Sequence, residues 1–269
     1  MITRAVSTWS LHRTLGQFAA EGSTVSGGRF ISAPSDPNGL PLIELPAKLA
    51  EHGYEAVQIC HFHIPSRDAD YIAALREQFD VAGVTVDAVL VDDGDLTGPD
   101  ADATEAWIAG WLETARDLGA HRVRVGAGLA APTPASLKES AIRLVRLAIE
   151  HPEVRVITEN WHDLLDNADA VNTLLDATGD RVGLLIDLGN WSGPDKYEQL
   201  ARIAGRAEAC HAKCRFDAHG PDKDDYQRAL QVLKDADFSG PMVLIYDGPS
   251  DDEWGMLDVE WTLVQQVFA

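Results

Sequence analysis

The sequence predicts an α/β fold, a single closed (β/α)8 barrel in which eight parallel strands are surrounded by eight helices. Short β-branched runs alternate with longer segments of helical periodicity, without a linker or a break in composition. The length of 269 residues is typical of one such barrel. No Gly-x-Gly-x-x-Gly turn follows any of the runs, which argues against an open doubly wound sheet. We therefore expect one domain over residues 1–269.

The expected strands are short and rich in Val, Ile and Leu, as parallel strands buried on both faces are. In chain order they span residues 5–11, 55–62, 84–91, 122–125, 154–162, 182–190, 209–215 and 242–246. The expected helices repeat apolar residues at helical spacing, and some carry terminal signals such as Thr133-Pro134 at a start and His52-Gly53 at an end. In chain order they span residues 42–51, 67–79, 104–118, 134–151, 167–177, 196–204, 224–233 and 253–267.

One connection is unusually long. The segment from about residue 16 to residue 40, after the first expected strand, is rich in Gly, Ser and Pro and has neither helical nor strand periodicity. Such a loop in a compact domain is usually a functional lid or a disordered segment. We expect it to close over the site or to contact a neighbouring subunit.

The net charge of −21 is the most informative bulk property. A protein that binds the phosphate backbone needs a basic surface, so nucleic acid is not an expected partner. No apolar run approaches the ~20 residues that span a bilayer, and the N-terminus lacks a basic segment followed by an apolar one. We expect a cytoplasmic protein without membrane contact, in which Cys60, Cys210 and Cys214 are reduced packing residues.

Three of the expected strands end on side chains that can bind a metal, namely Glu159, Asp187 and His211. The carboxyl ends of parallel barrel strands meet at one face, and side chains alternate along each strand, so these three can converge inside the barrel. Two carboxylates and an imidazole suit a divalent cation such as Mn²⁺, Mg²⁺, Co²⁺ or Zn²⁺. A network of ion pairs at the barrel rim explains the same pattern equally well.

Three basic residues near strand ends are further candidates. Lys213 shares the inward face of its strand with His211, so it can act as an acid, stabilise an oxyanion or anchor a substrate. An ion pair with one of the two carboxylates is the alternative. Arg124 and Arg215 can each hold a substrate carboxylate or phosphate, or form a salt bridge at the rim.

Side chains at the ends of the first three expected strands are weaker candidates. His12 and His61 can contact a substrate, although a rim histidine is more often hydrogen-bonded within the protein. Trp9 can provide an apolar platform for a sugar ring, with buried packing as the alternative. Asp92 and Asp93 are interpreted as a solvated turn.

Motifs at three strand ends and at one strand start resemble a known family. They are Thr-Glu-Asn-Trp-His at 158–162, Ile-Asp-Leu-Gly-Asn at 186–190, Cys-His-Ala-Lys at 210–213 and the segment 52–58. Together they resemble the sugar isomerases and epimerases of the xylose isomerase-like TIM barrel superfamily. In that family a glutamate, an aspartate, a histidine and a second glutamate, on strands five to eight, hold one divalent metal. The resemblance implies that Glu159, Asp187 and His211 are metal ligands and that the ion is Mn²⁺ or Mg²⁺, with Co²⁺ or Zn²⁺ as alternatives.

The chain departs from that family at several positions. Ile245 occupies the place of the strand-eight glutamate, which in the epimerases is also one of two acid/base residues. Asp247, two residues further along on the same face, is the candidate replacement, with water as the alternative. Gln58 stands where the family often has a glutamate. Asn190, which we assign to substrate binding, stands where the sugar epimerases have a histidine.

The resemblance implies a divalent-metal-dependent isomerase or epimerase that transfers a proton next to the carbonyl of a sugar or polyol. Glu159 is the expected base as well as a ligand, and Lys213 or Asp247 returns the proton. A related lyase, either a dehydratase or a C-glycoside-cleaving enzyme, and a catalytically degenerate sugar-binding barrel are alternatives. A nuclease similar to endonuclease IV would need more histidines and a basic groove, which the charge of −21 disfavours. Homo-oligomers are common in the resembled family.

Overall fold

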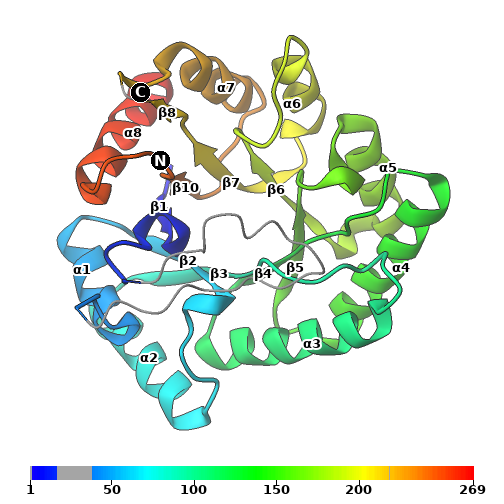
Figure 1. Cartoon of the computed structure of the whole chain (residues 1–269), viewed down its shortest axis with the longest axis horizontal. Helices are drawn as coiled ribbons and strands as arrows, with labels where there is room; N and C mark the ends of the chain where they lie inside the picture. Colours follow the sequence, from blue (N-terminus) through cyan, green and yellow to red (C-terminus); the bar gives the residue numbers. More distant parts are fainter. Residues whose placement is uncertain (1, 17–37, 218) are drawn as a thin grey trace.

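The computed structural model describes residues 2–16, 38–217 and 219–269. Eight parallel strands form a closed barrel in the order β1-β10-β7-β6-β5-β4-β3-β2, so the prediction of a (β/α)8 barrel is confirmed. The strands lie at the centre and the helices surround them (Figure 1). The long loop expected at about residues 16–40 lies almost entirely outside the described residues.

The barrel strands agree with the expected runs to within a few residues at most ends. They are β1 (Arg4–Ser7), β2 (Ala56–Cys60), β3 (Thr85–Val91), β4 (Arg122–Val125), β5 (Arg155–Glu159), β6 (Gly183–Asp187), β7 (Ala207–Lys213) and β10 (Met242–Ile245). A small antiparallel hairpin of β8 (Phe216–Asp217) and β9 (Gly220–Pro221), which the sequence did not predict, follows β7.

The helices begin and end close to the expected residues. They are α1 (Leu45–Glu51), α2 (Ala69–Ala82), α3 (Ala101–Leu118), α4 (Pro134–Glu150), α5 (Ala168–Thr178), α6 (Lys196–Ala204), α7 (Lys223–Asp235) and α8 (Glu253–Phe268). Thr133 caps α4 as expected. Its side chain accepts from the backbone amide of Ser136, and the side chain of Ser136 accepts from the backbone amide of Thr133.

The first expected strand was too long. β1 ends at Ser7, and Thr8–Leu11 form a 3₁₀ turn instead of extended chain. The reason is local: the Ser7 hydroxyl accepts from the backbone amide of Trp9 at 3.2 Å and starts the turn. The turn carries Trp9 to the pocket at the mouth of the barrel.

Strand alternation divides the apolar residues into two layers. On β4, for example, Val123 and Val125 belong to the large outer layer between strands and helices, whereas the side chains of Arg122 and Arg124 reach buried carboxylates inside the barrel. The inner apolar layer is thin and consists of small clusters of residues such as Ile157 and Leu185. Much of the interior is therefore available to polar groups.

Two irregularities in strand pairing bring further polar groups into the barrel. The register of β2 and β3 shifts between Val57 and Gln58, which leaves Asp87 without a partner in the pairing, and the register of β6 and β7 shifts so that Glu208 is skipped. A bulge re-aims the extra residue. Asp87 consequently points inward like its neighbour Ala88, and it bonds to Gln58 across the interior.

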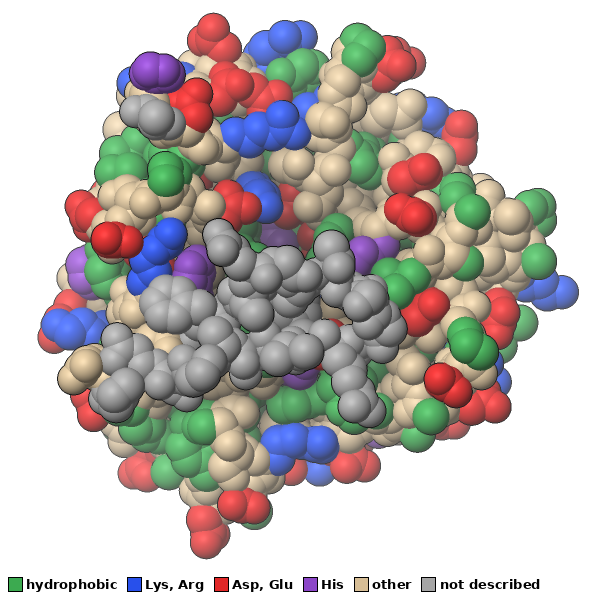
Figure 2. Space-filling model, viewed as in Figure 1, with side chains coloured by type: hydrophobic (Ala, Val, Ile, Leu, Met, Phe, Trp, Pro, Cys, Tyr) green, Lys and Arg blue, Asp and Glu red, His purple; other side chains and the backbone are tan. Residues whose placement is uncertain are grey.

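The surface carries mainly acidic charge. On the face shown in Figure 2, Asp and Glu side chains are spread around the described residues and alternate with single Lys and Arg side chains. None of the helices in residues 2–16, 38–217 and 219–269 has the length and apolar character that crossing a membrane would require. Cys60, Cys210 and Cys214 are buried free thiols.

Candidate metal centre

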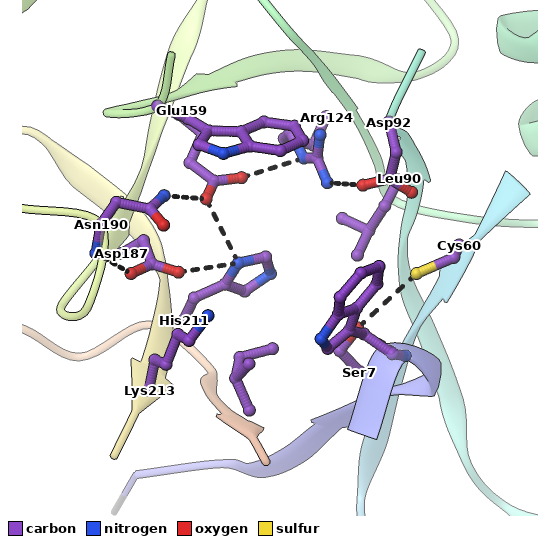
Figure 3. Close-up of a pocket in the computed structure, with 13 residues that line it drawn as sticks. Ser7, Cys60, Leu90, Asp92, Arg124, Glu159, Asp187, Asn190, His211 and Lys213 are labelled. Atoms are coloured by element: carbon purple, nitrogen blue, oxygen red, sulfur yellow. Dashed lines mark hydrogen bonds and ion pairs between the residues drawn. The ribbon is translucent and has the colours of Figure 1, made fainter. Parts of the chain in front are cut away.

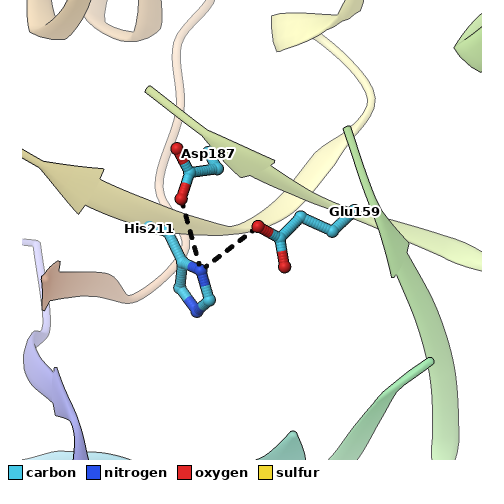
Figure 4. Close-up of side chains that lie close together, drawn as sticks. All are labelled: Glu159, Asp187 and His211. Atoms are coloured by element: carbon cyan, nitrogen blue, oxygen red, sulfur yellow. Dashed lines mark ion pairs between the residues drawn. The ribbon is translucent and has the colours of Figure 1, made fainter. Parts of the chain in front are cut away.

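Three buried side chains meet at the carboxyl ends of neighbouring strands. Glu159 ends β5, Asp187 ends β6 and His211 lies on β7, and one ligand atom from each lies within 4.8 Å of the other two. His211 Nδ1 is 3.6 Å from Glu159 Oε1 and 3.7 Å from Asp187 Oδ2 (Figure 4). The structure thus brings the three expected ligands together.

Backbone groups of the next loop orient Asp187. The amides of Gly189 and Asn190 donate to Asp187 Oδ1 at 2.6 and 2.8 Å, which leaves Oδ2 directed at His211. The side chain of Asn160 bonds both the amide and the carbonyl of Asp187 and so joins the ends of β5 and β6. Burial raises the pKa of Asp187, but His211 and Lys213 outweigh burial and lower it.

The two oxygens of Glu159 have different environments. Oε1 faces His211 and accepts from the side-chain amide of Asn190 at 2.8 Å. Oε2 is buried and has no hydrogen-bond partner among the described residues, although Arg124 Nε lies 3.1 Å away in an ion pair. A carboxylate oxygen held in this way is available to a ligand or a proton.

The ring of His211 is fixed from both sides. Nδ1 faces the two carboxylates, and Nε2 is 2.7 Å from the side-chain oxygen of Gln58. Burial lowers the pKa of His211, but Glu159 and Asp187 outweigh it and raise the pKa to about 9. The site therefore attracts positive charge, which a proton supplies here.

A divalent cation fits this set of residues. Two carboxylates and an imidazole nitrogen match the ligand preferences of Mn²⁺, Mg²⁺, Co²⁺ and Zn²⁺. Such an ion explains the negative charge that raises the pKa of His211, and the orphaned Oε2 leaves Glu159 a second oxygen that can take up a proton. A cation would replace the proton on His211 Nδ1.

The ligand cluster lines a pocket of about 200 Å³ at the mouth of the barrel (Figure 3). One side of the pocket is polar, with Glu159, Asp187, His211, Asn190 and Lys213. The rest is largely apolar and aromatic, and is formed by Trp9, Cys60, Leu90, Trp161 and Ile245, with Ser7, Asp92 and Arg124 among them.

The end of β10, where the resemblance implies a second glutamate, carries Ile245 instead. Ile245 lines the pocket and packs with Val243 and Trp9. Asp247 is not part of the ligand cluster found among the described residues, and its Oδ2 pairs with Lys213 Nζ at 2.6 Å. Burial lowers the pKa of Lys213, but Asp187 and Asp247 outweigh burial and raise it.

A second buried charge network lies beside the pocket. Arg124 pairs with Asp92 and Glu159 and stacks on the ring of Trp161, with its guanidinium carbon 4.9 Å from the ring centroid. His61 Nδ1 lies 3.7 Å from Asp92 Oδ2, and His61 Nε2 lies 3.5 Å from Asp93 Oδ2. Burial lowers the pKa of His61, but Asp92 and Asp93 raise it to about 9.

The interpretation of Asp92 and Asp93 as a solvated turn is therefore wrong. Both residues are buried, because Arg124 and His61 compensate their charge. Burial raises the pKa of Asp92, but Arg124 and His61 outweigh it and lower the pKa to about 2. The signal that could have indicated this was the pattern itself: an acidic pair directly after an apolar strand, with an arginine at the end of the next strand.

Not all the predicted substrate-binding residues reach the pocket. Trp9, Arg124 and Asn190 line it, whereas His12, His61 and Arg215 do not. His12 Nδ1 is 2.8 Å from the carbonyl of Trp9, and His61 belongs to the network beside the pocket. Arg215 is exposed beyond the end of β7.

Comparisons with known proteins agree with this architecture. Residues 46–261 match the family described as the xylose isomerase-like TIM barrel. None of the curated proteins compared with the sequence matches it.

Several solved structures are similar over most of their length. A xylose isomerase-like TIM barrel protein from Mycobacterium smegmatis, in complex with magnesium, is 15% identical, with a TM-score of 0.69 over 100% of this chain and 98% of that one. D-psicose 3-epimerase from Clostridium cellulolyticum H10, with D-tagatose, is 16% identical, with a TM-score of 0.64 over 85% and 93%. A probable 3-DHS dehydratase from Bacillus anthracis, involved in petrobactin synthesis, is 13% identical, with a TM-score of 0.65 over 98% and 99%.

At these identities the structural neighbours establish the fold and not the reaction, since barrels of this kind support different chemistries. The neighbours include both an epimerase and a probable dehydratase. The family match covers most of the chain and agrees with the closed barrel. The protein belongs to the xylose isomerase-like TIM barrel family.

Proposed function

We propose that the protein is a divalent-metal-dependent isomerase or epimerase that acts on a sugar or polyol by proton transfer next to a carbonyl. The observation that carries this proposal is the convergence of Glu159, Asp187 and His211 on one wall of a pocket, with one oxygen of Glu159 left without a hydrogen bond among the described residues. Further support comes from the similar structures that contain magnesium or D-tagatose.

Glu159, Asp187 and His211 would hold the ion through Oε1, Oδ2 and Nδ1, the atoms that face one another. Mn²⁺ or Mg²⁺ is favoured because two of the three ligands are carboxylates, and Co²⁺ or Zn²⁺ also suits the set. When bound, the ion supplies Lewis acidity that polarises a substrate carbonyl and makes the neighbouring C–H bond more acidic.

Glu159 Oε2 is the base in this proposal. It removes the proton from the carbon next to the carbonyl, and the electron pair of the C–H bond forms the enediolate. Lys213 Nζ, on the other side of the ligand cluster, donates a proton to the enediolate, and Asp247 holds Lys213 in place. The apolar side chains of Trp9, Leu90 and Ile245 limit the access of water to this intermediate.

The size of the pocket restricts the substrate. Its volume of about 200 Å³ is below the roughly 300–1,000 Å³ of sites for drug-sized ligands. A single small polyol or monosaccharide fits this volume better than a longer saccharide. Asn190, Arg124 and Trp9 are the residues of the pocket that we assign to substrate binding.

A lyase reaction is the second candidate, favoured by the environment of Ile245 and Lys213. The epimerases of the family place a second carboxylate where this chain has Ile245, whereas Lys213 provides an ammonium group close by. In a dehydration, Glu159 would remove the C–H proton, a double bond would form, and the leaving hydroxyl would take a proton from Lys213 and depart as water. One structural neighbour is a probable dehydratase.

Metal analysis of the protein purified without added metal tests the site. We expect about one divalent ion per chain in the wild type and in the exposed control His219→Ala, and a loss of that ion in His211→Ala. If the wild type takes up no metal even after Mn²⁺ or Co²⁺ is added, the metal-dependent proposal fails and a degenerate sugar-binding barrel takes its place.

Incubation with keto-sugars and keto-polyols in ²H₂O tests the reaction. Exchange of a substrate C–H for deuterium, abolished by Glu159→Gln, is expected for both reaction types. An epimer or isomer that has kept all its oxygens and carries deuterium at the exchanged carbon supports the isomerase or epimerase, and an unsaturated product that has lost water supports the lyase. Exchange that persists in Glu159→Gln at the wild-type rate would exclude Glu159 as the base.

A further inference from the structure

A chain of polar side chains crosses the barrel interior beneath the metal centre. Arg122 of β4 donates to Asp87 Oδ1, Gln58 Nε2 of β2 donates to Asp87 Oδ2 at 2.8 Å, and Gln58 Oε1 is 2.7 Å from His211 Nε2. Gln58, Asp87 and His211 are 0%, 3% and 5% exposed, so bulk solvent does not reach these groups. Barrel interiors are usually filled by branched apolar side chains, which makes a continuous polar chain here unusual.

The direction of every hydrogen bond in this chain follows from Arg122. A guanidinium can only donate, and an ionised carboxylate can only accept, so both oxygens of Asp87 are acceptors. Gln58 must therefore direct its NH₂ group at Asp87 and its carbonyl at His211. A carbonyl accepts, so His211 Nε2 carries a hydrogen. In the neutral ring the remaining nitrogen, Nδ1, then has its lone pair directed at Glu159 and Asp187.

The local structure makes this arrangement possible in two ways. The bulge on β3 turns Asp87 inward, where a regular strand pairing would have left it out of phase with Ala88. An amide at position 58 can donate on one side and accept on the other. A glutamate at this position would place its carboxylate against that of Asp87, and neither group could donate a hydrogen bond to the other. This row of hydrogen bonds therefore requires Gln58, the residue that sets this protein apart from the resembled family.

We propose that Gln58 is a positioning residue which, together with Asp87 and Arg122, holds His211 in the tautomer that presents Nδ1 to a metal ion. The inference rests on the proposed metal site and assigns to the buried chain the task of preparing one of its ligands. Residues that bind the second nitrogen of a metal-bound histidine set its tautomer and its basicity in many metalloproteins.

Asp87→Asn tests the proposal, because it changes hydrogen-bond direction with almost no change in shape. Arg122 can only donate, so the single oxygen of the new amide faces Arg122 and accepts from it. The NH₂ group of that amide then faces Gln58. Gln58 then has to turn its own amide and present NH₂ to His211 Nε2, which favours the tautomer with hydrogen on Nδ1. We expect Mn²⁺ affinity, measured by calorimetry, to fall roughly 10–100-fold. Glu208→Gln is the matched control, since Glu208 lies near Arg122 but leaves the Asp87 carboxylate unchanged.

The ring nitrogens give a second readout that does not depend on metal. In metal-free protein at alkaline pH, where the His211 ring is neutral, ¹⁵N chemical shifts should place the hydrogen on Nε2 in the wild type and in Glu208→Gln, and on Nδ1 in Asp87→Asn. Gln58→Met, which removes both hydrogen bonds and keeps an unbranched side chain, should also weaken Mn²⁺ binding and leave a mixture of tautomers.

The outcomes separate this inference from the proposed function. A wild type that binds no Mn²⁺ but shows the Nε2–H tautomer would refute the metal site and keep the tautomer assignment. A folded Asp87→Asn protein that keeps both the wild-type Mn²⁺ affinity and the Nε2–H tautomer would refute the positioning role. Far-UV circular dichroism establishes that each variant is folded.

Discussion

Arg124 is the cation on which the buried acidic groups beside the pocket depend. Its side chain is almost fully buried and pairs with Asp92 on one side and with Glu159 on the other, the latter at 3.1 Å. Replacing it with methionine keeps an unbranched chain of similar length and removes the charge. Two buried carboxylates then lose a partner, and among the described residues Asp92 keeps its ion pair with His61.

The expected cost is large for a single substitution. Removing one partner of a buried ion pair costs about 3–5 kcal/mol, because the other charge stays buried without compensation. Loss of the stacking on Trp161 adds about 0.5–2 kcal/mol, since the guanidinium lies 4.9 Å from the ring centroid. We therefore expect Arg124→Met to lower the unfolding free energy by about 3–5 kcal/mol or more, a large part of the stability of a typical domain.

Urea unfolding of metal-free protein, followed by circular dichroism, measures this loss. Arg116→Met is the control, because Arg116 pairs with Asp117 at the exposed surface and should change stability by less than about 0.5 kcal/mol. Asp92→Asn should cost less in the Arg124→Met background than in the wild type, with a coupling of about 0.5–3 kcal/mol. A loss below about 1 kcal/mol for Arg124→Met, or strict additivity, would refute the view that Arg124 compensates these charges.

Three further predictions concern the site and its surroundings. The pKa of His61 is raised from 6.5 to about 9, so protonation of this ring contributes about 3 kcal/mol to the free energy of unfolding. That contribution is fully present below pH 6.5 and is lost as the pH rises through about 9. Urea titrations of His61→Gln should therefore show an unfolding free energy that changes less with pH over that range. Lys213→Met should reduce turnover by roughly 10²–10⁴-fold with unchanged metal content, while Asp247→Asn should have a smaller effect; equal rates for Lys213→Met and the wild type would exclude Lys213 as the proton donor. Asn190→Ala removes the amide that holds Glu159 Oε1 and should weaken Mn²⁺ binding about 10–100-fold in calorimetry, whereas an unchanged affinity would show that Asn190 does not orient this ligand.

Regular periodicity made most of the fold predictable. Alternation of apolar runs with helical segments identified the eight strands and eight helices, and strand parity placed Glu159, Asp187 and His211 on the same inner face. The end of β1 was mispredicted because a single hydroxyl, that of Ser7, starts a turn within an apolar run. Such a side-chain to backbone bond does not alter periodicity, so a pattern of apolar residues does not reveal it.

The buried polar networks were not predictable in the same way. The inward position of Asp87 depends on a one-residue shift in strand pairing, which reverses the parity on which sequence reasoning relies. The burial of Asp92 depends on Arg124, a residue 32 positions along the chain. Charged residues are rarely buried unless paired, so a sequence in which the partner is unknown favours the exposed interpretation.

The replacement on the last strand bears most directly on the reaction. Ile245 lies beside Lys213 in the register of β10 and β7, so the wall that carries a second carboxylate in the epimerases here carries an apolar side chain and an ammonium group. Asp187 and Asp247 raise the pKa of Lys213 despite its burial, which keeps Lys213 protonated at neutral pH. A reversible epimerase needs a second group that accepts a proton as readily as it donates one, whereas a lyase needs only a donor for its leaving group. If Lys213 is the donor, we therefore expect turnover to persist up to a pH above the ordinary 10.5 of a lysine, and a product that has lost water would identify elimination as the reaction for which this wall is built.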